Sequence, residues 1–578
     1  MKKFLGIMIA GLVLFAAALV LFNKLHTSPG SRFLFSDGQA TWVQAPYEFN
    51  NRAKEIEERA TTFLKTFETD NDIREVSISL KVTGWAKLYL DGELLHEAGG
   101  PGDGIWKREA TLSVPEIGRG AHQVSLKVFN DSGPRLMLVN ADKINIESDH
   151  TWEAVNEDGS QQAVKTIADP IKMPAEIQGM SVREHVVSTL PVSISIFVLF
   201  VLLARNRKIV TLLNDPVRSE DYSSYFRFTC HALWLVLAVN CLSTPPDFGF
   251  DYQGHMAYIG YVFNNASLPL ADQGWQMFQT PLYYIVSAIV FKTGQLFSLP
   301  YTPAEVLRVV PLACGFAQIE IGYRIMKAVF PKQAASQMVG LSIITFMPMH
   351  LYMSQQLGNE VFAAVFTSAA IFYVIKFIND PEKLLDQKEQ LIFSVILSAA
   401  ILSKISALLL IFPTVVCLAW LLSRNAYKPK AITLIGLKIF FFVLLFTGWY
   451  FIRNLLELGQ PFVNGWSTSR GITWWQEPGF RTLGDLVAFG QALANPVLAS
   501  VYGLWDSLYS TMWFDGLQSG LGIGQMPPWN YSFALPVAWF SILPSLAIFV
   551  GIYRSFRCKG TTLKPVLIYS VSCIAIYV

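Results

Sequence analysis

Long apolar segments follow one another through the second two thirds of this chain, and they constrain its fold more than any other feature. Only 15% of the residues are charged and 52% are hydrophobic, whereas a soluble globular protein carries about 25% charged residues. A backbone inside a bilayer must satisfy its own hydrogen bonds, so such segments form helices. They lie at 186–204, 226–245, 281–298, 304–329, 334–356, 360–378, 390–403, 405–423, 431–452, 533–554 and 564–578. Together with an N-terminal segment, they predict a polytopic α-helical membrane protein with about twelve transmembrane helices.

The N-terminal segment is MKKFLGIMIAGLVLFAAALVLF, two lysines followed by about 19 apolar residues. A signal peptide is the alternative, but the run is long and no small-residue cleavage site follows it, so residues 1–23 are predicted to be a signal-anchor helix. The lysines place the N-terminus in the cytoplasm. The basic stretch 424–430 is then cytoplasmic as well, and the polar stretches 246–280 and 453–532 face outward. Between 281 and 423 the number of membrane crossings differs by one from the number that these orientations require. One segment there is re-entrant, doubled or miscounted, so its topology stays open.

Residues 30–180 alternate apolar and polar side chains with a period of two, as in VSISLKVTGWAKLYLDGELL, with turns at Asp91-Gly92 and Gly118–Gly120. This pattern predicts an antiparallel β-sandwich outside the cytoplasm, preceded by one helix at 51–67. No cysteine lies between Lys24 and His185, so no disulfide staples this domain.

The sandwich segments YLDGELL, IGRGAHQVSLKVFNDSG and TWEAVNEDGSQ resemble the galactose-binding-like jelly rolls that are attached to many carbohydrate enzymes. The resemblance covers about 110 residues and rests on a loose motif. It implies a jelly-roll topology. Two interpretations of its function stay open: the domain binds a sugar, or it is a sandwich that binds nothing.

The stretch FDYQGHMAYIGYVFNNASLPL, which begins at Phe250, interrupts the apolar pattern with polar side chains. It holds Asp251 and His255, and Asp247 lies just before it. An acid beside a membrane is costly unless water reaches it, and it tends to be functional. Asp251 is therefore the first candidate for chemistry.

This stretch resembles the first outer loop of the multi-spanning GT-C glycosyltransferases, in the family-39-like branch that contains protein O-mannosyltransferases and the lipid A aminoarabinose transferase. The matching elements are Asp251, Gly254-His255, Leu268-Pro269, Gln279 and Pro281-Leu282-Tyr283-Tyr284. Later segments occur in the order seen in that group: SQQLGNEVFAAVF, LSKISALLLIFP and WYFIRNLLELGQPF. The resemblance spans about 226–578, within a predicted transmembrane domain at 186–578.

Enzymes of that group take a sugar from a polyprenyl-phosphate donor and pass it to a glycan, lipid or protein acceptor outside the membrane. The resemblance implies that Asp251 is the general base, with His255 beside it and Asp247 as the second candidate. A phosphate leaving group needs cations as negative charge develops on it. The candidates, in falling order, are Arg453, Lys404 and Arg308. The residues expected in the donor and acceptor loop are Gln279, Tyr283 and Tyr284. A divalent metal such as Mg²⁺ or Mn²⁺ stays open, because one Asp and one His do not make a metal site.

A glycolipid transporter or flippase with a carbohydrate-binding ectodomain is the main alternative, and a binding protein that has lost catalysis is a third. A transporter is expected to show repeated halves with broken helices at the midplane. The polar residues gather instead in two outer loops, and no Walker A motif is present. The sequence therefore favours an enzyme in contact with membrane lipids, and the net charge of +2 argues against a nucleic-acid partner. Because the chain stops within the apolar run VLIYSVSCIAIYV, a further segment after Val578 is expected.

Overall fold

The computed structural model describes the chain in segments and divides it into two compact units. The described residues are 33–35, 40–45, 53–54, 60–99, 105–107, 109–130, 135–155, 159–166, 205–213, 219–240, 251–298, 301–465, 473–474, 481–494, 496–501, 503–514, 531–557 and 563–577, with scattered single residues and pairs elsewhere. The anchor at 1–23, the apolar run 186–204 and the loop 515–530 lie mostly or wholly outside them.

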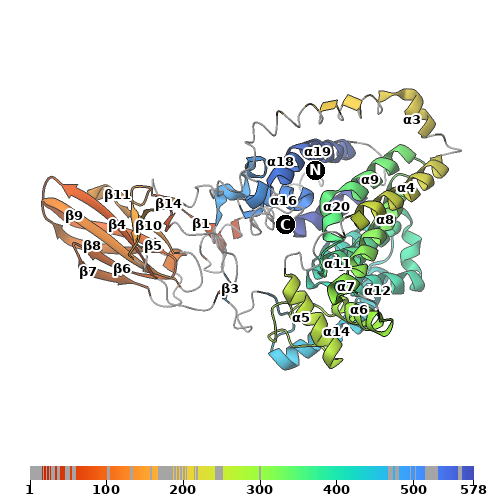
Figure 1. Cartoon of the computed structure of the whole chain (residues 1–578), viewed down its shortest axis with the longest axis horizontal. Coiled ribbons are helices and arrows are strands. Elements are labelled where there is room, and N and C mark those ends of the chain that lie inside the picture. The colour runs from red at the N-terminus through yellow and green to blue at the C-terminus, as the bar shows by residue number, and fades with distance from the viewer. Residues whose placement is uncertain are drawn as a thin grey trace. The chain divides into compact units, whose positions relative to one another are not determined.

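The first unit is an antiparallel β-sandwich, as the period-two pattern predicts (Figure 1). One sheet has the order β14-β2-β10-β5-β8 and the other has the order β13-β12-β4-β9-β6-β7. The strands are β2 (Val43–Gln44), β4 (Ala60–Thr69), β5 (Ile73–Val82), β6 (Trp85–Leu90), β7 (Glu93–Ala98), β8 (Ala110–Ile117), β9 (Gly120–Phe129), β10 (Leu136–Ala141), β12 (Glu153–Val155), β13 (Gln161–Ala163) and β14 (Lys165–Thr166).

Alternating side chains from the two sheets form one apolar core. On β9 Val124, Leu126 and Val128 are buried in this core, and the residues between them are partly exposed. Phe63 and Trp152 are fully buried in the same core. Because successive side chains of a strand point to opposite faces, this alternation fixes which face of each sheet is covered.

The helix expected at 51–67 is wrong. Residues Ala60–Thr69 form strand β4, which pairs with β9 along its whole length, from Ala60 opposite Phe129 to Thr69 opposite Gly120. The segment carries charges at helical spacing, but pairing with a long neighbouring strand overrides that local preference.

The second unit is helical (Figure 1). Its main helices are α4 (Ser219–Asn240), α5 (Tyr252–Asn265), α6 (Leu282–Leu296), α7 (Pro303–Leu307), α8 (Val309–Val329), α9 (Ala334–Phe346), α10 (Pro348–Met353), α11 (Glu360–Asn379), α12 (Gln387–Ser403), α13 (Ile411–Arg424), α14 (Pro429–Leu458), α16 (Leu504–Trp513), α18 (Tyr531–Phe540), α19 (Ile542–Arg557) and α20 (Leu563–Tyr577). Helix α11 packs between α8 and α12, and α12 packs against α14.

Within the described residues, helices occur where the apolar segments predict them, but twelve spans are not shown. Among the described residues, four stretches are long and apolar enough to cross a bilayer: Glu360–Asn379, Ile405–Arg424, Pro429–Leu458 and Ala534–Arg557. Ala334–Phe346 and Leu563–Ile576 are apolar but shorter. Proline and breaks in the helices divide other runs, as at Pro348, which separates α9 from α10.

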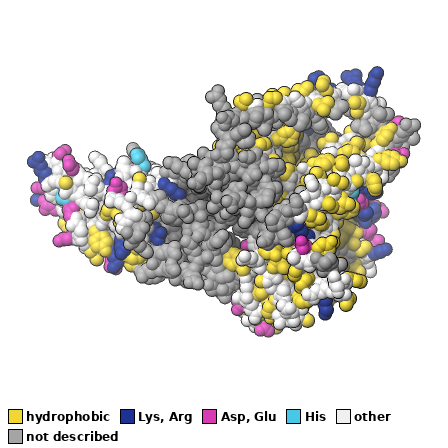
Figure 2. Space-filling view, in the orientation of Figure 1, with side chains coloured by type: hydrophobic (Ala, Val, Ile, Leu, Met, Phe, Trp, Pro, Cys, Tyr) yellow, Lys and Arg dark blue, Asp and Glu magenta, His cyan; other side chains and the backbone are white. Residues whose placement is uncertain are grey.

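Apolar side chains cover much of the visible surface of the helical unit (Figure 2). On α14 the outward-facing residues include Leu437, Phe440, Phe441 and Leu445, each more than half exposed. Apolar patches of this extent are unusual on a soluble monomer and are typical of a surface that contacts lipid. The helical unit therefore has the surface of an integral membrane protein.

Candidate active site

Asp251 stands immediately before α5 in a left-handed backbone conformation, with φ of 62°. Aspartate is one of the few non-glycine residues that adopt this conformation readily. Its Oδ1 accepts a hydrogen bond of 2.7 Å from Nε1 of Trp275, in the loop that follows α5. The turn and the indole together hold the carboxylate in one place.

His255 lies one turn further along α5 and is almost fully buried. Its Nδ1 is 2.9 Å from the hydroxyl of Tyr284 on α6, and the two rings are stacked. Tyr284 stacks in turn on Tyr258, with ring centroids 3.7 Å apart. These aromatic contacts fix the orientation of the imidazole, whose Nε2 then points away from Tyr284.

Two further charges come from the ends of apolar helices. Glu360 is the first residue of α11, and Lys404 follows the last residue of α12 in an extended conformation. Nζ of Lys404 is 3.0 Å from Oε1 of Glu360, and both side chains are about one third exposed. The interruption of the helix at Lys404 is what places its ammonium group beside the start of α11.

Glu360 and His255 meet at Gly358. A Cβ atom on Gly358 would lie 2.5 Å from Oε2 of Glu360 and 3.5 Å from Nε2 of His255. Asp251 feels the charges of His255, Glu360 and Lys404 in addition to its bond from Trp275. Two carboxylates, an imidazole and an ammonium group therefore share one polar centre.

A hydrogen-bonded frame supports this centre. Asn359 is fully buried, and its Nδ2 donates to Oε1 of Gln279 and to the carbonyl of Ser403. The hydroxyl of Tyr450 on α14 donates to the carbonyl of Gln279. The loop after α5, the start of α11, the end of α12 and the end of α14 are thereby tied together.

Burial controls the proton affinities of the two groups on and beside α5, which lie outside the candidate spans. Burial raises the pKa of Asp251 above its ordinary value, although the bond from Trp275 and the charges of His255 and Lys404 act in the opposite direction. Burial lowers the pKa of His255, against the pull of Glu360 and Asp251. At neutral pH the imidazole is therefore uncharged, and the Asp251 carboxylate is a stronger base than one in water.

An apolar cavity of about 430 Å³ reaches Glu360. It lies among α8, the α9–α10 region, α11 and α16, and four of its lining residues are methionines: Met347, Met349, Met353 and Met512. Methionine is flexible and adapts to ligands of irregular shape. The cavity joins a polar centre to a space suited to an apolar chain.

The structure brings together some of the residues singled out from the sequence and separates others. Asp251, His255, Lys404, Gln279 and Tyr284 belong to the polar centre or its frame. Tyr283 is buried beside them, with its ring edge-on to His255. Asp247 lies outside the described residues.

The two arginines make contacts with backbone carbonyls. The guanidinium of Arg453 donates to the carbonyls of Leu268 and Pro269 at 2.8 to 3.1 Å. Arg308 donates to the carbonyl of Leu242 at 3.0 Å and is buried. Of the three candidate cations, Lys404 is the one that joins the carboxylates.

Sequence reasoning missed Glu360, Trp275 and Gly358. Glu360 has a signal that could have found it, since it is an acid at the start of a long apolar run. Trp275 and Gly358 have none, because their roles arise only from contacts between distant segments. Among the described residues, no group of three or more His, Cys, Asp or Glu side chains is arranged to hold a metal ion.

No family model matches the sequence, and no curated protein matches it. Several solved structures are similar in part. An α-L-rhamnosidase of Streptomyces avermitilis is 16% identical over 22% of this chain and 16% of its own, with a TM-score of 0.17. The Pleurotus ostreatus lectin is 13% identical over 22% of this chain and 41% of its own, with a TM-score of 0.18.

The archaeal oligosaccharyltransferase AglB of Archaeoglobus fulgidus, in complex with an inhibitory peptide and a dolichol-phosphate, is 14% identical over 61% of this chain and 39% of its own, with a TM-score of 0.31. This chain thus spans less than half the length of each of these proteins. At such identities and scores, the likenesses assign no family to it.

Proposed function

We propose that the protein is a membrane glycosyltransferase that moves a sugar from a polyprenyl-phosphate-linked donor to an acceptor on the extracytoplasmic side of the membrane. One observation carries the proposal: a half-buried carboxylate, a neutral imidazole and a Glu–Lys pair meet at the ends of apolar helices, where an apolar cavity begins. This arrangement supplies a base, a cation and room for a lipid at one place.

Asp251 acts as the general base. Trp275 occupies Oδ1 of the carboxylate, which leaves Oδ2 to accept the proton of an acceptor hydroxyl. Because burial raises the pKa of Asp251, the carboxylate approaches the proton affinity that general base catalysis near neutral pH requires. His255, held by Tyr284, stays uncharged at neutral pH. A charged imidazole there would lower the pKa of Asp251 and weaken it as a base.

Lys404 stabilises the leaving phosphate. Its ammonium group is partly exposed and pairs with Glu360 at 3.0 Å, so a donor phosphate can share it by competing with a carboxylate. The negative charge that develops on the phosphate during transfer strengthens that contact, which is the kind of interaction that accelerates a reaction. The isoprenoid chain of the donor lies in the methionine-lined cavity that reaches Glu360.

Substitution of Asp251 tests the proposal. Asp251→Asn keeps the size of the side chain, the bond from Trp275 and a residue that tolerates the left-handed backbone, but it removes the base. We expect transfer to fall by roughly 10² to 10⁴, measured with purified protein in vesicles containing polyprenyl-phosphate sugars and by glycan analysis of a complemented deletion strain. Asp272→Asn, an exposed residue of the same loop, is the matched control and should retain wild-type transfer.

The outcomes separate the alternatives. Full activity of Asp251→Asn together with loss of activity in Asp247→Asn would move the base to Asp247. Full activity of both variants would refute the transferase. A transporter or flippase needs no base, so glycolipid translocation that is unchanged in Asp251→Asn, without any transfer by the wild type, would favour that function.

A further inference from the structure

Lys438 is a charged residue in a membrane-spanning helix at the end opposite to the candidate active site. It is the tenth residue of α14 and lies within the apolar stretch Pro429–Leu458. At 1.5 Å per residue, it is about 22 Å along the helix from Arg453. That distance is about three quarters of the thickness of a hydrocarbon core, about 30 Å, so Lys438 lies in the half of the span opposite to Arg453.

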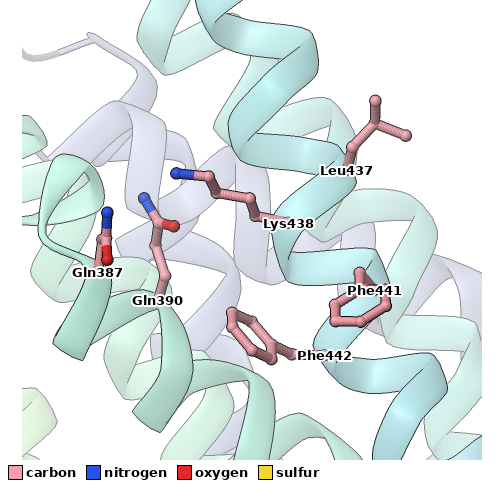
Figure 3. Close-up of a pocket in the computed structure, with 6 residues that line it drawn as sticks. All are labelled: Gln387, Gln390, Leu437, Lys438, Phe441 and Phe442. Atoms are coloured by element: carbon pink, nitrogen blue, oxygen red, sulfur yellow. The ribbon is translucent and has the colours of Figure 1, made fainter.

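A pocket of about 270 Å³ lies beside Lys438, between α12 and α14. Figure 3 shows the lysine amine and the amides of Gln387 and Gln390 turned toward the same space, with Phe442 below them. A water molecule takes about 30 Å³ in the liquid, so the space is equivalent to about nine waters. It therefore has room for a small polar headgroup.

Lys438 has no counter-ion in the part of the chain that the structure describes. The two carboxylates nearest in sequence to the pocket lining on α12 are engaged elsewhere: Glu389 forms an ion pair of 2.7 Å with Lys376, and Asp386 accepts from the backbone of Lys388. An unpaired ammonium group in an apolar environment is costly unless an anion joins it. The pocket therefore attracts an anion.

A second unsatisfied group lines the same pocket. Gln390 is 2% exposed, and its Nε2 donates to the carbonyl of Leu384 at 2.7 Å, while its buried Oε1 has no hydrogen-bond partner. A buried acceptor without a donor loses free energy. The occupant that completes the pocket thus brings both an anionic oxygen for Lys438 and a hydrogen-bond donor for Gln390.

The surroundings of the pocket identify the occupant as a lipid. Leu437 and Phe441, on the rim, are 58% and 59% exposed, and a second apolar cavity of about 250 Å³ lies nearby between α12, α13 and α14. A free anion buries none of this apolar surface when it binds. The acyl chains of a lipid bury it, which stabilises the bound state. We propose that this pocket binds an anionic phospholipid, with the phosphate on Lys438 and a headgroup hydroxyl donating to Gln390.

The test compares lipids on the full-length protein by native mass spectrometry. Phosphatidylglycerol, which has both the charge and the hydroxyls, should be retained more tightly than phosphatidylcholine or phosphatidylethanolamine. Lys438→Gln should weaken phosphatidylglycerol binding about fivefold, since one lysine near a membrane surface is worth about that factor. Lys438→Arg should restore it, which also shows that the site tolerates substitution.

Lys430→Gln is the matched control, because Lys430 is an exposed lysine in the first turn of the same helix and lines no described pocket. It should bind phosphatidylglycerol as the wild type does. Equal retention of all three lipids, or wild-type retention in Lys438→Gln, would overturn the proposal. Displacement of the lipid by millimolar inorganic phosphate would assign the pocket to a free anion and would also overturn it.

Discussion

The carboxylate of Asp251 is subject to opposing influences that are unequal in size. Burial raises its pKa and is the largest of them, the bond from Trp275 and the charges of His255 and Lys404 lower it, and Glu360 raises it. A carboxyl group whose pKa is raised by folding favours the protonated state in the native protein. Its contribution to stability is therefore greatest at low pH and is lost as the pH rises through that pKa. Asp251→Asn should thus fold at least as stably as the wild type at neutral pH.

The pH dependence of transfer should report these influences one at a time. A base is active when deprotonated, so the rate should fall as the pH drops through the pKa of Asp251, above the ordinary range of an aspartate. Trp275→Phe removes an interaction that lowers this pKa, so the acid limb should move to higher pH. Glu360→Gln removes one that raises it, so the limb should move to lower pH. Rate profiles of the three proteins check this, and identical acid limbs would assign the limb to another group.

Residues of the polar centre were predictable where they break a pattern. Asp251 and His255 interrupt an apolar stretch, and that interruption singles them out in the sequence. The contacts of Arg453 could not be predicted, because the carbonyls that it binds are 184 and 185 positions away in the chain. Its position at the end of an apolar helix is compatible with binding a phosphate or with binding a loop, and the fold brings a loop to it.

At the scale of elements, Arg453 fastens the loop after α5 to α14. Its planar guanidinium reaches two consecutive carbonyls, those of Leu268 and Pro269. The same loop carries Trp275, which donates a hydrogen bond to Asp251. If Asp251 is the base, as proposed, Arg453 positions it through this loop.

Arg453→Lys should loosen this loop while keeping the charge. A lysine donates from one nitrogen and cannot bracket two carbonyls as a fork does. Losing one or two hydrogen bonds from a charged donor costs about 1.5–3 kcal/mol each at most, so amide exchange in residues 266–281 should accelerate and transfer should fall. Arg324→Lys, an exposed arginine paired with Glu320, is the control. Unchanged exchange in the loop would exclude the clamp, and a selective loss of donor affinity would restore a phosphate role for Arg453.

In the sandwich, His122 links two turns at the ends of strands, the β6–β7 turn and the β8–β9 turn. Nδ1 of His122 is 2.7 Å from Oδ2 of Asp91, and Nε2 is 2.8 Å from the carbonyl of Gly118. The Asp91 carboxylate and then the Gly118 carbonyl raise the pKa of His122, and the bond from His122 lowers the pKa of Asp91. Both ring nitrogens can donate only when the imidazole is protonated.

The start of β9 should therefore become less protected as the pH rises. A histidine whose pKa is raised by folding stabilises the native state fully below its unfolded pKa, near 6.5, and loses that effect as the pH rises through the folded value. Because the Asp91 side chain is about half exposed and solvent screens the pair, the change in amide protection should be up to about fivefold. Hydrogen exchange of the full chain at pH 6 and pH 8 measures it. His122→Gln should abolish the pH effect, and His96→Gln, an exposed residue of β7, should keep it.

For the whole molecule, the periodicity of the sequence was sufficient to predict two kinds of architecture in their correct order. Period-two alternation located the sandwich, and apolar runs located most of the helices. The number of spans was not predictable from hydropathy, because breaks such as the one at Pro348 divide a segment, 334–356, that is continuous by hydropathy. The helix expected before the sandwich failed for the converse reason, since the pairing of β4 with β9 involves residues some 60 positions apart.

The orientation of the whole chain in its membrane can be measured directly. Positive charges beside apolar helices stay in the cytoplasm, so the sandwich should face outward and the stretch 424–430 inward. Ser113→Cys, on an exposed position of β8, should react with an impermeant thiol reagent in cells whose outer envelope is permeabilised. Lys430→Cys should react only after the inner membrane is ruptured, and the wild type serves as the blank. Protection of Ser113→Cys in intact inner membranes would reverse the assignment.

Gly358 constrains which substitutions homologous sequences can carry at this position. A methyl group at this position would lie 2.5 Å from Oε2 of Glu360, so an alanine there would push the carboxylate aside. A larger side chain at position 358 can be accommodated only if the Glu360 carboxylate swings away, which takes the acid out of the centre. In a collection of homologous sequences, the glycine and the acid two positions later should be gained and lost together, whereas the exposed loop around Asp272 is free to diverge. That joint inheritance would distinguish chains that keep this centre from chains that keep only the apolar helices.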